Sequence, residues 1–181
     1  MKSSIQKGTV YWITGLSGAG KTTIGRLFYE QLLHRKQNVV FLDGDTMREL
    51  FNNDLGHSIE DRKKLAMFYS KLCRVLSDQG IDIVCATISM FHECQEWNKK
   101  NIKNFKEIYL RVPLDILKKR DQKELYSRAL NQELKNVMGL DLKFEEPQRP
   151  DVVIDNDGTK APTDIAKELF KKFCLSTVEK K

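Results

Sequence analysis

A glycine-rich segment near the amino terminus constrains this chain more than any other part of the sequence. Residues 15–23 read GLSGAGKTT and match the pattern G-x-x-x-x-G-K-[ST]. The apolar run Val10–Thr14 precedes this segment, and the amphipathic stretch Lys21–Arg35 follows it. A strand, a loop of this composition and a helix, in that order, are typical of a phosphate-binding loop.

The residue types in this loop suit a bound triphosphate. Glycines let the backbone curl so that successive N–H groups point inward, and the start of the following helix adds positive charge. The Lys21 ammonium can reach the outer phosphates, and the Thr22 hydroxyl is placed to ligate magnesium. The sequence therefore predicts ATP and Mg²⁺ as cofactors, bound by Gly15, Ser17, Gly18, Ala19, Gly20, Lys21, Thr22 and Thr23.

Short apolar runs alternate with longer segments of helical period, which indicates a parallel sheet covered by helices. The expected strands are Val10–Thr14, Val39–Leu42, Ile81–Ala86, Ile108–Val112 and Val152–Ile154. The expected helices are Lys21–Arg35, Thr46–Phe51, Ile59–Gln79, Glu93–Asn101, Leu114–Lys119 and Thr163–Phe173. The prediction is an α/β fold of the P-loop NTPase type, with three α/β/α layers and about five strands, as one domain over residues 1–181.

Two helical stretches have a more specific interpretation. In the expected helix Ile59–Gln79, apolar residues recur at three- and four-residue spacing and predict a core-facing stripe of Leu65, Phe68, Tyr69, Leu72 and Leu76. Residues 120–150 are polar and helix-permissive, and Pro147 and Pro150 follow before the last strand. This second stretch is expected to form a mobile lid.

Composition narrows the class of protein. The chain has 181 residues, 40% of them hydrophobic, with no run near eighteen apolar residues and no signal-like amino terminus, so we expect a cytoplasmic protein without a membrane partner. The four cysteines, Cys73, Cys85, Cys94 and Cys174, lack metal-site spacing and are expected to be reduced thiols. The formal charge of +6 fits a nucleic acid or a polyphosphate substrate, and the scattered lysines favour the substrate.

A second polar cluster, Asp43-Gly44-Asp45 with Arg48, directly follows the second expected strand. In open α/β sheets, ligands bind at the carboxyl ends of the strands. One carboxylate can hold magnesium-bound water, the other can orient an acceptor hydroxyl, and the guanidinium can grip an acceptor phosphate. The structural alternative is an Asp-Gly turn in which Asp45 caps a helix, and both interpretations can hold together.

Residues 54–62 form a third cluster, reading DLGHSIEDR. Ser58 and Asp61 have the spacing of a capping box, and Arg62 adds another guanidinium. The role of His57 is ambiguous, whereas His34 and His92 are expected at the surface because no metal shell surrounds them.

With these motifs in place, the chain resembles the adenylylsulfate kinase family over nearly its whole length. The resemblance rests on ordered blocks: Gly15–Thr23; Leu42–Asp45 with Arg48; Asp54–Gly56 with Ser58, Asp61 and Arg62; Ile88-Ser89; Pro113-Leu114; Arg120-Asp121 with Lys123; Leu125-Tyr126; Lys135-Asn136; Gly139; and Glu146-Pro147. Members of this family use magnesium–ATP to phosphorylate the ribose 3′-hydroxyl of a small nucleotide. Members often dimerise, so a homodimer is expected, but no sequence feature identifies its interface.

The resemblance implies a role for each matching residue. Lys21 and Thr22 would serve the phosphates and magnesium, with Asp43 supporting the metal's water shell, and Asp45 would face the 3′-hydroxyl. Arg48 and Arg62 would hold the acceptor phosphate, and Arg120 would stack on the ATP base. Ser89 matches a family serine that borders the acceptor and has been assigned a phosphoserine role, although in-line transfer needs no covalent serine. Lys135 would lie in the lid near both substrates.

Departures from the family pattern lie on the acceptor side. Leu65, Met67 and Phe68 stand where the family has an asparagine and two arginines, and Met90, His92 and Gln95 replace a proline and arginines. Two aromatic residues that sandwich the acceptor adenine become His57 and Val137. Lost guanidinium groups remove charge-assisted bonds that contribute about 1.5–3 kcal/mol each.

These departures favour a different acceptor nucleotide. The sequence looks similar to the branch that phosphorylates cytidine diphosphoramidate on the way to phosphoramidate-decorated capsular polysaccharide. A true adenylylsulfate kinase, which makes 3′-phosphoadenylylsulfate in sulfate assimilation, is the first alternative. A non-catalytic ATP-binding sensor is the second, although a sensor has no use for an acceptor-facing Asp45. A nucleic-acid kinase would need a clustered basic groove, which the sequence lacks.

Overall fold

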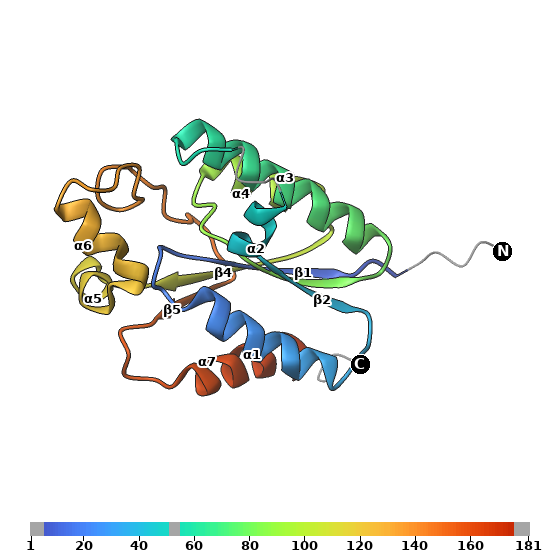
Figure 1. Cartoon of the computed structure of the whole chain (residues 1–181). Helices are drawn as coiled ribbons and strands as arrows, with labels where there is room; N and C mark the ends of the chain where they lie inside the picture. The colour runs from blue at the N-terminus through green and yellow to red at the C-terminus, as the bar shows by residue number, and fades with distance from the viewer. Residues whose placement is uncertain (1–5, 51–54, 176–181) are drawn as a thin grey trace.

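A five-stranded parallel sheet lies at the centre of the computed structural model, which describes residues 6–50 and 55–175 (Figure 1). The strand order is β2-β3-β1-β4-β5. The strands are β1 (Thr9–Thr14), β2 (Val39–Asp43), β3 (Asp82–Ala86), β4 (Asn104–Arg111) and β5 (Val152–Asp155). All five predicted strands are confirmed.

The central strand β1 explains why apolar runs predict this sheet. Trp12 pairs with Cys85 of β3 on one side and with Glu107 of β4 on the other. Because helices cover both faces, consecutive residues of β1 are buried rather than alternate ones. β4 begins at Asn104, four residues before the predicted start, since Thr9 at the beginning of β1 pairs with it.

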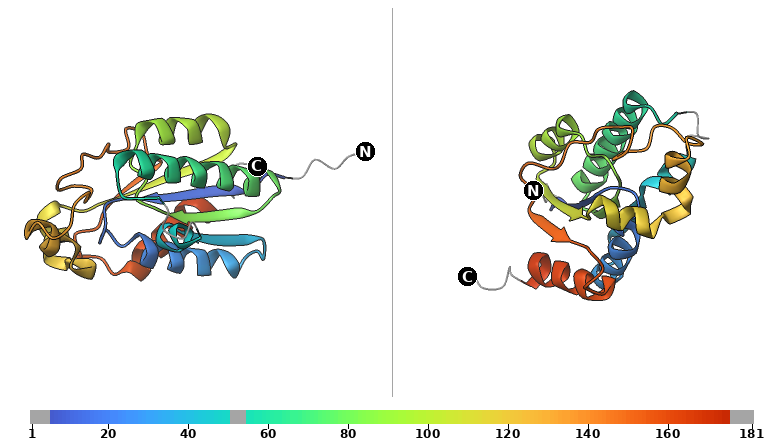
Figure 2. Two further views of the ribbon diagram at one scale, coloured as in Figure 1. Left: turned by 45° about the horizontal axis from the view of Figure 1, so that its top comes forward. Right: turned by 90° about the vertical axis from the view of Figure 1, so that its left-hand side faces the viewer.

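Helices cover the two faces of the sheet, as the two further views make clear (Figure 2). On one face lie α1 (Lys21–Leu33) and α7 (Pro162–Phe170), the latter followed by the π-helical turn η2 (Lys171–Leu175). On the other face lie α3 (Ile59–Asp78) and α4 (His92–Asn101). The predicted three-layer α/β/α fold is therefore confirmed. Phe51, at the end of one expected helix, and Asp54 lie outside the described residues.

The core forms where the sheet meets the helices. Trp12 of β1 and Phe28 of α1 are fully buried. In the predicted stripe, Leu65 and Tyr69 are buried and two further leucines pack against the core. Phe68 was wrongly placed in that stripe: 43% of it is exposed, because it lies on the flank of α3 beside Tyr69.

The segment predicted as a lid lies beyond the carboxyl ends of the strands (Figure 1). It follows α5 (Leu114–Arg120) and contains the 3₁₀ turn η1 (Gln122–Glu124) and α6 (Leu125–Leu130). Asp121, Lys123 and Glu124 have φ angles of 34°, 59° and 54°. Residues other than glycine rarely adopt this backbone conformation. Gln132 and Asn136, further along the segment, also have positive φ angles, so backbone strain occurs both at its entrance and within it.

The cysteines and the helices agree with two expectations drawn from the composition. Cys73, Cys85 and Cys94 are buried, Cys174 is half-buried, and all four are free thiols. Within the described part of the chain, each helix is too short or too polar to cross a membrane.

We expect Glu124→Gly to stabilise the protein, because a left-handed backbone costs a residue with a Cβ about 1 kcal/mol that glycine avoids. For a chain of this size, the melting temperature should rise by about 2–4 °C in a circular-dichroism melt. The control is Gln122→Gly in the same turn, where φ is not positive and glycine should lower the melting temperature. An equal shift in both variants would contradict the explanation.

Candidate active site

The loops that follow β1, β2 and β3 meet at the carboxyl edge of the sheet and enclose one cleft. Parallel strands bring the ends of non-consecutive segments together in this way. The predicted site residues that line the cleft are Ser17, Gly18, Gly20, Lys21, Thr22, Thr23, Asp43, Asp45, Arg48, Arg62 and Ser89.

The phosphate-binding loop, residues 15–23, is held in shape by hydrogen bonds to its carbonyl groups. Four consecutive carbonyl oxygens each accept a bond from a side chain. The pairs are Lys21 Nζ to Leu16 (2.8 Å), Tyr126 Oη to Ser17 (2.9 Å), Arg120 Nη1 to Gly18 (3.1 Å) and Asn156 Nδ2 to Ala19 (2.9 Å). This arrangement leaves the first N–H groups of α1, which have no partner within the helix, facing the cleft.

Glycine is required at two places in this loop. A Cβ at Gly15 would lie 2.6 Å from the carbonyl oxygen of Leu110 on β4. Gly20, directly before α1, has φ 88° and ψ 13° in the left-handed region. The loop is therefore both tightly packed on the sheet and sharply turned into the helix.

Lys21 carries its ammonium group into the interior of the loop. Burial lowers its pKa to about 8, against the opposing effect of the Asp45 and Asp43 carboxylates. A bound polyanion would reverse that shift, since an opposite charge nearby favours the protonated amine.

Asp43 connects the phosphate-binding loop to the acceptor-side helix α2 (Gly44–Glu49). Its Oδ2 accepts a hydrogen bond of 2.6 Å from Thr22 Oγ1, and its Oδ1 accepts from the backbone N–H groups of Asp45 and Thr46. The alternative that Asp45 caps this helix is wrong, because the helix begins at Gly44, two residues earlier than predicted, and Asp43 is its cap. No group of three or more His, Cys, Asp or Glu able to hold a metal occurs in residues 6–50 and 55–175.

Asp45 extends into solvent and meets a residue from the far side of the cleft. Its Oδ2 lies 3.1 Å from Nζ of Lys123, and the two side chains are 80% and 74% exposed. The strained backbone of η1 is what presents Lys123 there. Lys123 belongs to a matching sequence block, but no pattern predicts this contact, which joins residues 78 positions apart.

Arg48 and Arg62 each hold backbone carbonyls of the loop before α3. Arg48 Nη1 donates to the carbonyls of Leu55 (2.9 Å) and Gly56 (3.0 Å). Arg62 Nε donates to the His57 carbonyl at 2.9 Å. Burial and then the neighbouring Arg48 lower the pKa of Arg62 from its usual range, so an anion between the two guanidinium groups would be favoured.

Ser58 caps the start of α3 as predicted, but the second bond differs from that of a capping box, because Asp61 accepts from the Ser58 hydroxyl and not from its backbone N–H. Ser58 Oγ accepts from the Asp61 N–H at 3.2 Å and donates to Asp61 Oδ2 at 2.7 Å. This cap fixes the first turn of α3, from which Arg62 reaches both the cleft and the carbonyl of Asn136 at 2.9 Å.

The floor of the cleft carries hydroxyl groups that the sequence analysis mostly missed. Thr87 Oγ1 and Ser89 Oγ lie 2.9 Å apart. Tyr69 Oη donates to the Gly44 carbonyl at 3.3 Å, and burial raises its pKa to about 12, so the phenol stays neutral. The sequence pattern placed Tyr69 in the core. The side chain is buried as predicted, but it also lines the cleft.

Besides Gly15 and Ala19 of the loop, four predicted residues do not line the cleft. His57, Lys135 and Val137 are not among the described residues that line the cleft, and Val137 is buried in the core. Burial and the two nearby arginines lower the pKa of His57, which favours the neutral ring. Arg120, predicted near the ATP base, joins the Gly18 carbonyl to that of Asn156 (2.8 Å).

Asp43→Ala should destabilise the protein by about 1 kcal/mol, because α2 loses its side-chain cap and Thr22 loses an acceptor. Asp45→Ala, two residues away, should change the free energy of unfolding by less than about 0.5 kcal/mol, since only an exposed ion pair is lost. Urea unfolding of both variants measures the difference. A larger loss in Asp45→Ala would show that the roles of the two carboxylates are exchanged.

Comparison with known proteins is consistent with this geometry. The family model of adenylylsulphate kinase matches residues 7–155. A cytidine diphosphoramidate kinase of Campylobacter jejuni is 41% identical over 169 residues, covering 92% of this chain and 96% of the relative. A probable adenylyl-sulfate kinase of Archaeoglobus fulgidus is 42% identical over 148 residues, covering 82% of this chain and 96% of the relative.

A solved structure supports the same assignment. The Mycobacterium tuberculosis APS kinase CysC in complex with AMPPNP and APS has a TM-score of 0.83 to this chain at 30% identity, covering 91% of this chain and 96% of the other. The family match and the relatives named as kinases make this protein a phosphotransferase. The chain therefore belongs to the adenylylsulfate kinase family.

Proposed function

We propose that the protein uses magnesium–ATP to phosphorylate a ribose 3′-hydroxyl, and that the acceptor is cytidine diphosphoramidate. The observation that carries the choice of acceptor is the contrast between the two halves of the cleft. The donor half keeps every residue of the phosphate-binding pattern. Among the described residues that line the acceptor half, Tyr69, Phe91 and Thr87 stand beside two arginines. The terminal phosphoramidate has an NH2 group where the sulfate has an oxygen, and cytosine is smaller than adenine, so this acceptor offers one oxygen fewer to guanidinium groups and a smaller face for stacking.

The relatives support this proposal. The kinase of C. jejuni aligns over 92% of this chain, and the adenylyl-sulfate kinase of A. fulgidus over 82% at similar identity. Phosphorylation of that acceptor would place the protein in the cytoplasm and in the supply of phosphoramidate for capsular polysaccharide.

The donor set fits magnesium. Thr22 Oγ1 and Asp43 Oδ2 are hard oxygen ligands 2.6 Å apart, beside the loop that would hold the phosphates. Magnesium keeps several waters and takes one or two protein oxygens, so Thr22 would bind it directly and Asp43 through water. When bound, the ion would neutralise charge on the phosphate oxygens.

Asp45 is the proposed partner of the acceptor hydroxyl. In the complex its carboxylate would accept a hydrogen bond from the 3′-hydroxyl and align that oxygen with the γ-phosphorus. Lys21 and the first N–H groups of α1 would balance the charge that develops on the phosphoryl oxygens. Lys123, which meets Asp45 at 3.1 Å, would move from the carboxylate to the substrates. Ser89, hydrogen-bonded to Thr87, would border the acceptor.

The segment 120–150 is the proposed lid of this single-domain kinase. Arg120 and Tyr126 attach its beginning to the phosphate-binding loop. Closure over both substrates would exclude water and limit wasteful hydrolysis of ATP.

The experiment is ATP turnover against adenylylsulfate, cytidine diphosphoramidate, other cytidine and uridine diphosphates, and no acceptor. We expect turnover with the cytidine compound and at least a hundredfold loss in Asp45→Ala, since a positioned acid–base group contributes about 10²–10⁴-fold. ATP binding should survive in that variant. Preference for adenylylsulfate would establish the first alternative, and tight ATP binding without any turnover would establish the sensor.

ATP binding should take up protons near pH 8. Because the pKa of Lys21 is lowered to about 8 in the free protein, Lys21 is neutral in about half of the molecules at that pH. The phosphates would restore the ammonium, so about half a proton is taken up per ATP, and affinity should fall as the pH rises above 8. Calorimetry at pH 8 in two buffers of different ionisation enthalpy measures the uptake. Lys21→Arg, which stays charged, should show none; equal uptake in both proteins would assign it elsewhere.

A further inference from the structure

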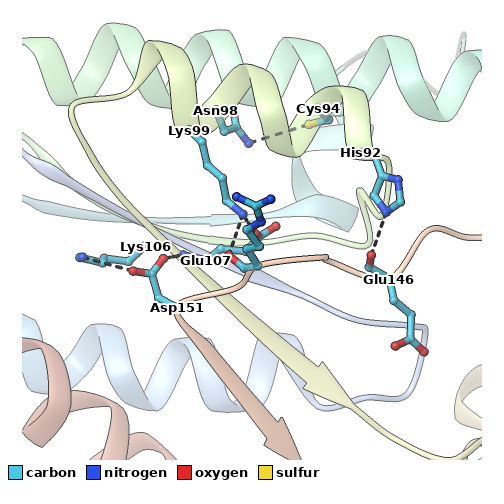
Figure 3. Close-up of polar contacts among 9 residues, drawn as sticks. His92, Cys94, Asn98, Lys99, Lys106, Glu107, Glu146 and Asp151 are labelled. Carbon is cyan, nitrogen blue, oxygen red and sulfur yellow. Dashed lines mark hydrogen bonds and ion pairs between the residues drawn. The ribbon is translucent and has the colours of Figure 1, made fainter.

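The lid returns to the sheet beneath α4. Residues Glu145–Asp151, here named the return segment, connect the end of the proposed lid to β5. Figure 3 shows this segment passing beneath α4, with His92, Lys99 and Glu107 directed toward it. The segment has no regular secondary structure of its own, so side chains of its neighbours determine its path.

The first attachment lies at the start of α4. The N–H of Glu145 donates to the Met90 carbonyl at 3.1 Å, and the N–H of His92 donates to Glu145 Oε2 at 2.6 Å. The His92 ring adds a bond of 2.9 Å between Nε2 and the Glu146 carbonyl. The helix cap residue Phe91 supplies no side-chain bond itself, so Glu145 caps α4 from a distant part of the chain.

The second attachment lies two helical turns further along α4. Lys99 Nζ donates to the Arg149 carbonyl at 2.8 Å. Seven residues of helix span about 10 Å, and three residues of extended chain also span about 10 Å. His92 and Lys99 therefore match the spacing of the Glu146 and Arg149 carbonyls, which explains how one helix face holds the segment at two points.

Lys99 also compensates a buried charge. Its Nζ lies 2.8 Å from Glu107 Oε2, in an ion pair whose angles fall outside those of a hydrogen bond. Glu107 is fully buried, and burial raises the pKa of its carboxyl group. The Glu107 N–H in turn donates to Asp151 Oδ2 at 2.9 Å, which fixes the far end of the return segment.

These contacts are next to the acceptor half of the cleft. Met90, which receives the bond from Glu145, stands between Ser89 and Phe91, and both of those residues line the cleft. The other end of the lid is attached to the donor half, through Arg120 and Tyr126. We propose that Glu145, His92 and Lys99 are positioning residues that fix the lid to the acceptor wall, separately from its attachment to the donor loop. This inference rests on the proposed function.

Steady-state kinetics and ATP binding to the free enzyme test the separation. His92→Ala should raise the KM for the acceptor about fivefold, the loss of about one hydrogen bond, and leave the Kd for ATP within twofold. His92→Gln, whose amide can donate to the Glu146 carbonyl, should recover most of the loss. Tyr126→Phe should raise the Kd for ATP and leave the KM for the acceptor unchanged. His34→Ala, at an exposed histidine, should change neither constant. Equal changes in both constants, or none, would overturn the proposal.

A double variant separates positioning from charge compensation. Lys99→Met alone leaves Glu107 buried without its partner and should lower the melting temperature. Lys99→Met with Glu107→Gln should recover that temperature but keep the raised acceptor KM, because the bond to the Arg149 carbonyl is still missing. Recovery of both would show that Lys99 only neutralises Glu107.

Hydrogen exchange tests the attachment without an acceptor. In His92→Ala, amide exchange should increase together in residues 88–92 and 144–151, with no change at the phosphate-binding loop. Unchanged exchange in both segments would overturn the proposal even if the kinase acts on another acceptor. Increased exchange in a protein that transfers phosphate to no acceptor would instead contradict the proposed function alone.

Discussion

The rest of the site depends on four hydrogen bonds. In each of them a side chain donates to a carbonyl group of the phosphate-binding loop. A glycine-rich backbone has no preferred shape, and its conformational freedom must be removed before its N–H groups can form a fixed anion site. The donors come from α1, α5, α6 and the end of β5, so the loop is shaped by elements from much of the chain. Each element also carries other parts of the site, which are thereby placed relative to the phosphates.

The two halves of the cleft are built differently. The donor half consists mainly of backbone held by buried or half-buried side chains, whereas the acceptor half consists of side chains on α2, α3 and the end of β3. Asp43 belongs to both, because it accepts from Thr22 and caps α2. Changes in the acceptor side chains can therefore alter the substrate without moving the phosphate site.

Much of this organisation could be predicted from the sequence. The strands were predictable because both faces of the sheet are covered, which makes the apolar runs continuous, and Ser58 was predictable because capping is a local interaction. The carbonyl bonds from Tyr126 and Asn156 span more than a hundred positions, and no local pattern encodes them. Phe68 was misplaced because a helical stripe is broad at its edges, and periodicity alone does not define where burial stops.

The exposed ion pair of Asp45 and Lys123 makes one part of the site sensitive to salt. Both groups stand in water, so their attraction weakens as ionic strength rises and the Debye length shortens. A hydroxyl group that binds the Asp45 carboxylate would have to displace Lys123, and a free cation would meet the same competition. The strength of this pair therefore depends on the salt concentration. The bonds that shape the phosphate-binding loop are less sensitive to salt, because each of them ends on a neutral carbonyl group.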